Sequence, residues 1–154
     1  MSRHVKGSAK GQSLVEFALV FPVFVLVMFG LFDIGRAVYA FNTISNASRE
    51  SVRIAIVNQT EADIDAEALK QGVSLGLTPT DVTISYGNPG GTGTCSSPFV
   101  GCRVAVTVQY LYVAATPVIG QIIGPFTMSS TTEMPVEREC PDPDNPSLTT
   151  CPWP

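Results

Sequence analysis

The sequence predicts an α+β protein in which one long N-terminal helix crosses a membrane and continues into a small external domain. Three observations support this fold class: an apolar run near the N-terminus, a helix-period apolar stripe after it, and three segments with strand-type alternation in the second half. The chain has 154 residues, enough for one small domain with appendages. Only 14% of its residues are charged, against roughly 25% in soluble domains.

A polar leader and an apolar helix open the chain. Residues 1–11 show no apolar period, and their basic members are Arg3, Lys6 and Lys10. The 19 residues from 14 to 32 hold one charged side chain, that of Glu16. As a helix they span about 28 Å, close to the ~30 Å hydrocarbon core of a bilayer. We therefore assign residues 12–35 to a transmembrane helix.

Flanking charge predicts the orientation of this single span. The leader carries basic residues and no acid, whereas Asp33 and Arg36 roughly cancel on the far side. The positive-inside rule then places the N-terminus in the cytoplasm and the following domain outside. A secretory signal peptide is the rival interpretation, but its apolar region is usually shorter and is followed by a small-x-small cleavage site.

Residues 36–57 are expected to continue the helix beyond the membrane. An apolar stripe recurs at steps of three and four residues, which is the period of a helix face. The stripe consists of Ala37, Val38, Phe41, Ile44, Ser48, Val52, Ala55 and Ile56. Arg49 and Arg53 lie on the opposite face with Glu50, either solvated or anchored to the domain, and Glu50 is spaced to pair with Arg53.

Residues 58–139 are expected to form the external domain. Thr60 and Asp63 resemble a capping box that opens a second helix over residues 61–75. Strand patterns follow at residues 82–86, 103–113 and 126–134, which predicts an antiparallel sheet of about three strands. So small a sheet needs a cover, and the two helices are the candidates. The tail, residues 140–154, is rich in proline and is expected to be irregular.

Four cysteines lie in the external part and indicate an oxidising compartment. They allow three disulfide connectivities, of which local pairing is preferred. Local pairing would join Cys95 with Cys102 and Cys140 with Cys151. The chain contains no CxxC motif and one histidine, so no metal site is expected.

Charge and motifs exclude several classes of function. The net charge is −4, and loss of the three basic leader residues would make it −7, which disfavours nucleic-acid binding. No GxSxG, P-loop or GxGxxG motif is present. We therefore expect no catalysis, no cofactor and no small-molecule substrate.

The junction between leader and span contains the strongest functional signal. A carboxylate at the edge of a span, such as that of Glu16, is costly unless it is paired. Cleavage after Gly11 would create an α-amino cation on Gln12, about one helical turn from Glu16. The interfacial alternative is that Glu16 reaches the headgroups near the start of the helix.

Three segments resemble signatures of TadE-like proteins, the pseudopilins of the tight-adherence (Flp) branch of type IV pili. They are residues 11–20 (GQSLVEFALV), 32–36 (FDIGR) and 46–53 (NASRESVR). The resemblance implies a pilin-like fold and cleavage by a prepilin peptidase between Gly11 and Gln12. Glu16 and Phe17 would complete the recognition pattern. Gln12 in place of an N-terminal phenylalanine fits the Tad branch.

The resemblance also implies a role and a location. The chain would be a minor pseudopilin that works in pilus assembly through helix packing. Its partners would be the prepilin peptidase, other pilins and pseudopilins, the assembly platform and membrane lipid. It would lie in the bacterial cytoplasmic (inner) membrane or in a surface pilus. Asp33 and Arg36 would be either an exposed pair or a contact between packed helices.

Two alternatives keep the same topology. The first is an uncleaved envelope protein whose external domain binds a ligand or an envelope component. The second is a pseudopilin of a type II secretion machine, which Gln12 disfavours.

Overall fold

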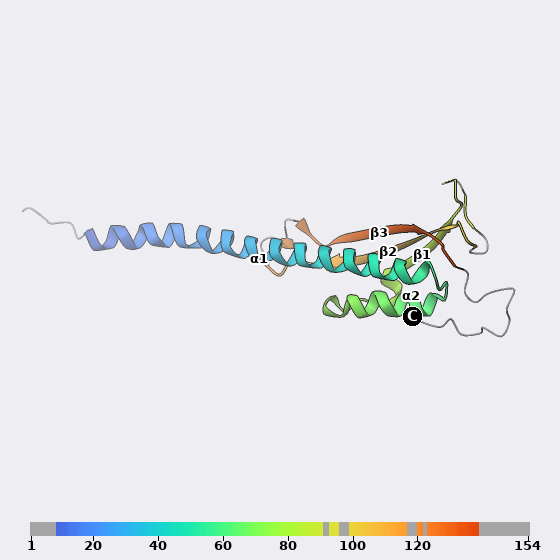
Figure 1. Cartoon of the computed structure of the whole chain (residues 1–154). Coiled ribbons are helices and arrows are strands. Elements are labelled where there is room, and N and C mark those ends of the chain that lie inside the picture. The colour runs from blue at the N-terminus through green and yellow to red at the C-terminus, as the bar shows by residue number, and fades with distance from the viewer. Residues whose placement is uncertain (1–8, 91–92, 96–98, 117–119, 122, 139–154) are drawn as a thin grey trace, which may run out of the picture.

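The computed structural model describes residues 9–90, 93–95, 99–116, 120–121 and 123–138, and it confirms the α+β class. Helix α1 (Ala9–Ala55) is one long rod with Pro22 inside it. Its second half carries a compact unit made of helix α2 (Glu61–Gln71) and a small sheet (Figure 1). The N-terminal half of α1 projects away from that unit. The long helix begins and ends within three residues of the predicted bounds, 12 and 57.

The sheet has three antiparallel strands in the order β1-β2-β3. They are β1 (Val82–Gly87), β2 (Arg103–Tyr112) and β3 (Phe126–Pro135), close to the three predicted strands. Two short 3-10 helices, η1 (Val73–Leu75) and η2 (Pro79–Asp81), connect α2 to β1. The central strand β2 alternates as predicted, with Val104, Val106 and Val108 fully buried.

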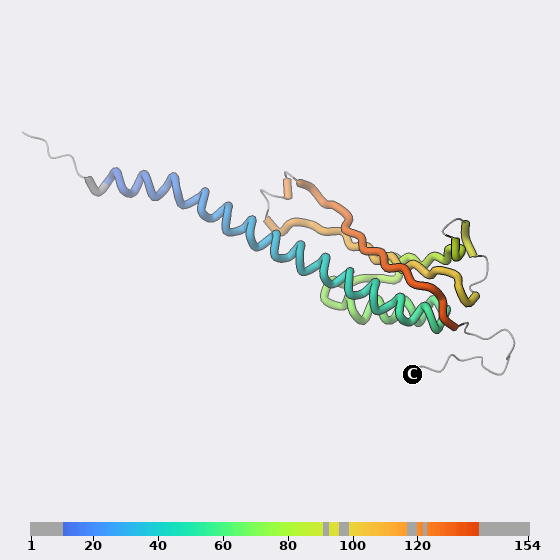
Figure 2. Tube along the Cα trace, turned by 45° about the horizontal axis from the view of Figure 1, so that its top comes forward, coloured from blue at the N-terminus to red at the C-terminus, as the bar shows by residue number. Residues whose placement is uncertain are grey.

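The core lies between the second half of α1, the sheet and α2. Helix α1 contacts β2 and β3 on one side and α2 on another, and Figure 2 shows all of them side by side. Ile44 and Val52 of α1 and Ile64 of α2 are fully buried in this core. Burial of such side chains contributes roughly 1.5–3 kcal/mol each, so α1 supplies the cover that the sheet needs.

Small side chains form much of the buried face of α1. Ala40, Ala47, Ser48 and Ala55 are almost fully buried there, and their size lets the helix approach the sheet closely. Ser48 Oγ lies 2.9 Å from Thr132 Oγ1 and 3.2 Å from Ser130 Oγ, in hydrogen bonds to β3. The buried hydroxyl of Ser48 is therefore satisfied across the interface.

The predicted apolar stripe is wrong at two positions. Val38 and Phe41 keep about half of their surface exposed. The apolar period is correct, but the sheet packs against the line of Ala40, Ile44 and Ala47. Since each residue turns the helix by about 100°, Val38 points well away from that line.

The predicted capping box is also replaced by another arrangement. Thr60 is the N-cap residue of α2, but its side chain makes no capping hydrogen bond. The Asn58 side-chain amide instead donates to Asp63 Oδ2 at 2.7 Å, and Asn58 Oδ1 accepts from the Thr60 N–H at 2.9 Å. Asn58 is buried between the helices, so its amide takes the acceptor that a capping box would use.

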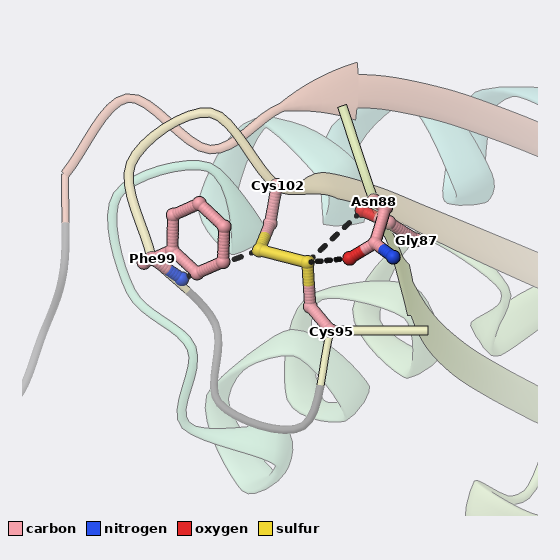
Figure 3. Close-up of a disulfide and its surroundings, with 5 residues drawn as sticks. All are labelled: Gly87, Asn88, Cys95, Phe99 and Cys102. Carbon is pink, nitrogen blue, oxygen red and sulfur yellow. Dashed lines mark hydrogen bonds between the residues drawn. A yellow bond between two sulfur atoms is a disulfide. The ribbon is translucent and has the colours of Figure 1, made fainter. Parts of the chain in front are cut away.

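The local disulfide between Cys95 and Cys102 is present. It closes the connection between β1 and β2, close to Gly87 and Asn88, and the Phe99 N–H donates to Cys102 Sγ (Figure 3). Cys102 is fully buried in the core. The other predicted pair, Cys140 and Cys151, lies outside the described residues.

Ala47→Leu tests the close approach of α1 to the sheet. Overpacking this fully buried site is expected to destabilise the domain by about 1–3 kcal/mol. Chemical unfolding of the full chain in detergent measures the loss. Asn46→Leu, at the exposed neighbouring position, is the matched control and should change stability by less than about 0.5 kcal/mol. Equal stability of the two variants would contradict this packing.

Candidate functional site

The N-terminal half of α1 is apolar and exposed. Its large side chains, such as those of Leu19 and Phe24, keep more than half of their surface exposed. This helix is long and apolar enough to cross a membrane. Its exposed apolar surface is therefore suited to contact with lipid or with other helices.

The predicted processing residues lie at the beginning of this helix. Gly11 and Gln12 belong to the first turns of α1, and Glu16 and Phe17 follow about one turn later. All of these positions are exposed, and a Cβ on Gly11 would meet no atom within 4 Å. A protease needs an extended segment at the 11–12 bond, and the terminal turn of a helix opens at low cost.

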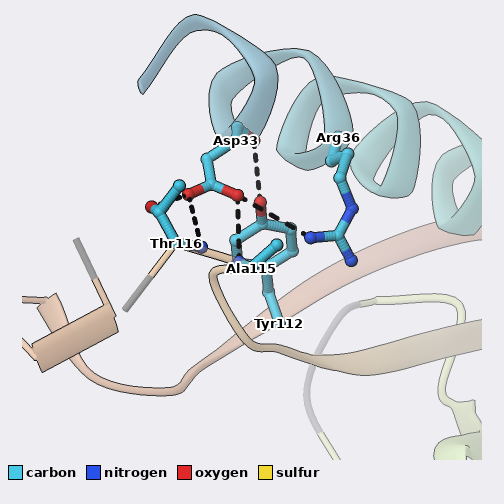
Figure 4. A network of polar contacts seen from close by, with 5 residues as sticks. All are labelled: Asp33, Arg36, Tyr112, Ala115 and Thr116. Carbon is cyan, nitrogen blue, oxygen red and sulfur yellow. Dashed lines mark hydrogen bonds and ion pairs between the residues drawn. The ribbon is translucent and has the colours of Figure 1, made fainter. Parts of the chain in front are cut away.

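The end of the apolar run carries a polar clamp around Asp33 (Figure 4). The Asp33 carboxylate accepts hydrogen bonds from the backbone N–H groups of Ala115, at 3.0 Å, and Thr116, at 3.2 Å. The Thr116 hydroxyl donates a third bond to the same carboxylate. These donors come from the segment between β2 and β3, so the clamp ties the end of the sheet to α1.

Tyr112 at the end of β2 completes the clamp. Its hydroxyl donates to the Asp33 backbone oxygen at 2.7 Å. Burial raises the pKa of this hydroxyl, which therefore stays protonated and able to donate at neutral pH. Backbone and side chain of Asp33 thus both bind the same end of the hairpin.

The structure corrects the interpretation of Asp33 and Arg36 as an exposed pair. Asp33 is only 5% exposed, because the loop donors cover its carboxylate. Arg36 stays half exposed, with Nη1 3.7 Å from Asp33 Oδ1 and its guanidinium carbon 5.9 Å from the centre of the Tyr112 ring. The contact of Asp33 and Arg36 with other packed helices remains a prediction.

Beside the clamp lies an apolar groove of about 390 Å³. It is lined by α1, by the end of β2 and the start of β3, and by residues of the connection between these strands. The lining residues are Gly30, Asp33, Ile34, Ala37, Tyr112, Ala114, Ile123 and Phe126. Because loop donors occupy the carboxylate of Asp33, the surface that the groove presents to a contacting molecule is apolar.

The two remaining basic positions lie farther along α1. Arg49 and Arg53 are exposed, and Arg53 Nη1 lies 3.6 Å from Glu50 Oε2 as the spacing predicts. An exposed pair of this kind contributes well under about 1 kcal/mol to stability. The structure thus brings Asp33 and Arg36 together but keeps Arg49 and Arg53 apart from that clamp.

Sequence reasoning missed the partners of Asp33. Two of its donors are backbone N–H groups of Ala115 and Thr116, which no side-chain motif reveals. One usable signal was present: an acid at the edge of an apolar span requires donors nearby. The sequence does not identify where in the chain those donors lie.

Fold and clamp define a class of helix-anchored α+β proteins, in which one N-terminal apolar helix packs its second half on a small antiparallel sheet. The family model described as TadE-like protein matches residues 11–53, which confirms the resemblance seen in the sequence. This match points to involvement in Tad pilus systems and to association with pilus components in general. No curated protein and no solved structure matches the chain significantly.

Asp33→Asn tests the clamp. The neutral amide loses the charge-assisted bonds and presents an N–H₂ group to donors that need an acceptor. The Ala115 and Thr116 amides should then exchange with deuterium on the order of tenfold faster, while core amides such as that of Val106 keep their rate.

Arg36→Gln is the matched control for this variant. It removes the longer ion pair but leaves the three loop bonds in place. The exchange rates of the loop amides should therefore change much less than in Asp33→Asn. Unchanged loop exchange in Asp33→Asn would contradict the clamp.

Proposed function

We propose that this chain is a minor pseudopilin that takes part in the assembly of a Tad/Flp-type pilus. In this proposal it inserts with its N-terminus in the cytoplasm, is cut after Gly11, and packs through α1 with other pilins. The observation that carries the proposal is the exposed apolar surface of α1 in a chain whose residues 11–53 match the TadE-like family. The mechanism is assembly and not catalysis.

The apolar surface of α1 extends beyond the predicted span. Ile34, Val38 and Phe41 are 62%, 54% and 49% exposed, and their spacing places them on one side of the helix. Exposing apolar area to water costs roughly 25 cal/mol per Å². A helix of another pilin or pseudopilin is a suitable cover, with Arg36, Arg49 and Arg53 exposed nearby for polar contacts.

Glu16 has a specific part in this proposal. After cleavage, the α-amino group of Gln12 would lie one helical turn away, in the same or a neighbouring subunit. An α-amino group titrates near 7.7–8.0 in model compounds, so it is mostly cationic at neutral pH. Breaking a pair of this kind in a low-dielectric site costs roughly 3–5 kcal/mol. Assembly would thus favour the cleaved form over the uncleaved one.

The partners follow from these steps. The prepilin peptidase would act on residues 11–17, other pilins and pseudopilins would cover α1, and the assembly platform would move the subunit out of the membrane. No catalytic residue, cofactor or small-molecule substrate has a part in the proposal.

Gly11→Ala tests the processing step. The expected result is loss of cleavage, because the recognition pattern requires glycine before the scissile bond. The added methyl group meets no atom within 4 Å, so the fold should not change. Intact mass and N-terminal sequencing of the membrane-extracted protein from its native cell provide the measurement, with a start at Gln12 expected for the wild type.

Gly35→Ala is the matched control, since its Cβ also meets no atom within 4 Å, and it should be cleaved normally. A wild-type protein that starts at Met1 or Ser2 would contradict the pseudopilin assignment. The uncleaved envelope protein would then be the better account.

Incorporation into the pilus tests the helix contacts. Glu16→Ala and Val38→Glu should each lower the amount of protein in sheared pili roughly tenfold or more, because each leaves an unpaired charge in an apolar interface. The amount in the membrane should not change. Asn46→Glu, at an exposed polar position, should incorporate like the wild type. Equal incorporation of all variants would exclude these contacts.

A further inference from the structure

The β2–β3 hairpin is free of charge over an unusual length. No charged residue occurs between Arg103 and Glu133. These two bounding residues form an ion pair, with Arg103 Nε 2.6 Å from Glu133 Oε1. They lie near the start of β2 and the end of β3. Asp33 of α1 contacts the opposite end of the hairpin. The end that meets α1 beside Asp33 is therefore its uncharged end.

This uncharged end lies where the predicted span ends. The clamp places Tyr112, Ala115 and Thr116 against Asp33, the residue directly after the apolar run that ends at Phe32. Figure 1 shows the hairpin end reaching back along α1 toward the N-terminal half. If α1 spans a bilayer, the hairpin end lies at the level of the outer interface.

Apolar side chains at this end point into solvent. Leu111, Val113 and Ile123 are each more than half exposed, and Phe126 is 40% exposed. Ile123 and Phe126 line the apolar groove together with Gly30 and Ile34 of the helix. The apolar surface of the span thus continues onto the hairpin, and no charged residue of the hairpin lies between the two.

The backbone and aromatic groups also suit an interface. The Ala115 and Thr116 N–H groups are bound by Asp33, and those of Gly120 and Gly124 donate to Thr116 and Gly120 at 2.8 and 3.0 Å. Satisfied backbone groups lower the cost of leaving water. The Tyr112 and Phe126 rings lie 5.3 Å apart, and aromatic rings are enriched at membrane interfaces.

We propose that the described residues at the end of the β2–β3 hairpin, 111–116 and 123–126, form a second membrane contact, which lies in the outer leaflet of the bilayer that α1 spans. Val113, Ile123 and Phe126 contact lipid acyl chains at the headgroup boundary. Arg36, half exposed beside Tyr112, binds the phosphates of the headgroups. The inference rests on the proposed membrane span but not on cleavage or pilus incorporation.

Tryptophan quenching by brominated lipid tests this contact in the full, uncleaved chain. In a Trp153→Phe background, Ile123→Trp is reconstituted in two sets of phosphatidylcholine–phosphatidylglycerol vesicles. One set carries bromine near the headgroup end of the acyl chains and the other near their methyl ends. Phe24→Trp, within the apolar run, is the positive control. Phe99→Trp, an exposed aromatic position beside the disulfide at the other end of β2, is the negative control.

The expected result is a loss of Ile123→Trp emission with bromine near the headgroups that is at least half as large as the loss of Phe24→Trp emission with bromine near the methyl ends. Phe99→Trp should lose no emission in either set. Val113→Trp, at a second exposed position of the same end, should be quenched like Ile123→Trp. Quenching of Phe24→Trp without quenching at positions 113 and 123 would overturn the proposal and leave the span intact.

Two further readouts identify why such a failure occurs. Red-shifted, unquenched emission would place the hairpin end in water. Blue-shifted emission that turns red when the protein is diluted in lipid would show that a second copy covers it. If Phe24→Trp itself is not quenched, the span fails and the proposed function fails with it.

Discussion

The core of the domain depends on the second half of α1, because a sheet of three strands is too small to enclose a core of its own. β2 and β3 lie against this helix and α2 lies beside it. The carbonyl of Ile56, directly after α1, also accepts hydrogen bonds from the Glu137 and Arg138 N–H groups that follow β3, at 2.9 and 3.1 Å. Removing the helix would expose the buried face of β2 and the partners of α2 together. The second half of α1 and the domain therefore form one packed unit.

In this arrangement the two halves of one continuous helix have different surroundings. The first half exposes large apolar side chains on every side, whereas the second half buries small ones such as Ala40 and Ala47. The change occurs near Asp33, whose buried carboxylate meets three donors from the β2–β3 connection. A charge that would be costly at the edge of an apolar run is thereby used to fix the hairpin on the helix.

Hydrophobic period and length were enough to predict the long helix, the second helix and all three strands. They did not predict which apolar positions the domain covers. Val38 and Phe41 fit the period, but their exposure depends on how the sheet packs around Ala40 and Ile44. Asn58 displaced the expected capping box because its burial between the helices is a tertiary feature. Asp33 shows the same limit, since its backbone donors are more than 80 residues away.

The two proposed surfaces have linked consequences for assembly. A subunit that leaves the bilayer must exchange lipid for protein around α1 and, on the further proposal, around the hairpin end as well. Acyl chains and aliphatic side chains are similarly apolar, so this exchange changes the hydrophobic free energy little. The polar clamp at Asp33 need not open during the exchange, because its partners all belong to the same chain. The hairpin end would then travel with the helix as a rigid unit and meet the neighbouring subunit at the level where it had met lipid.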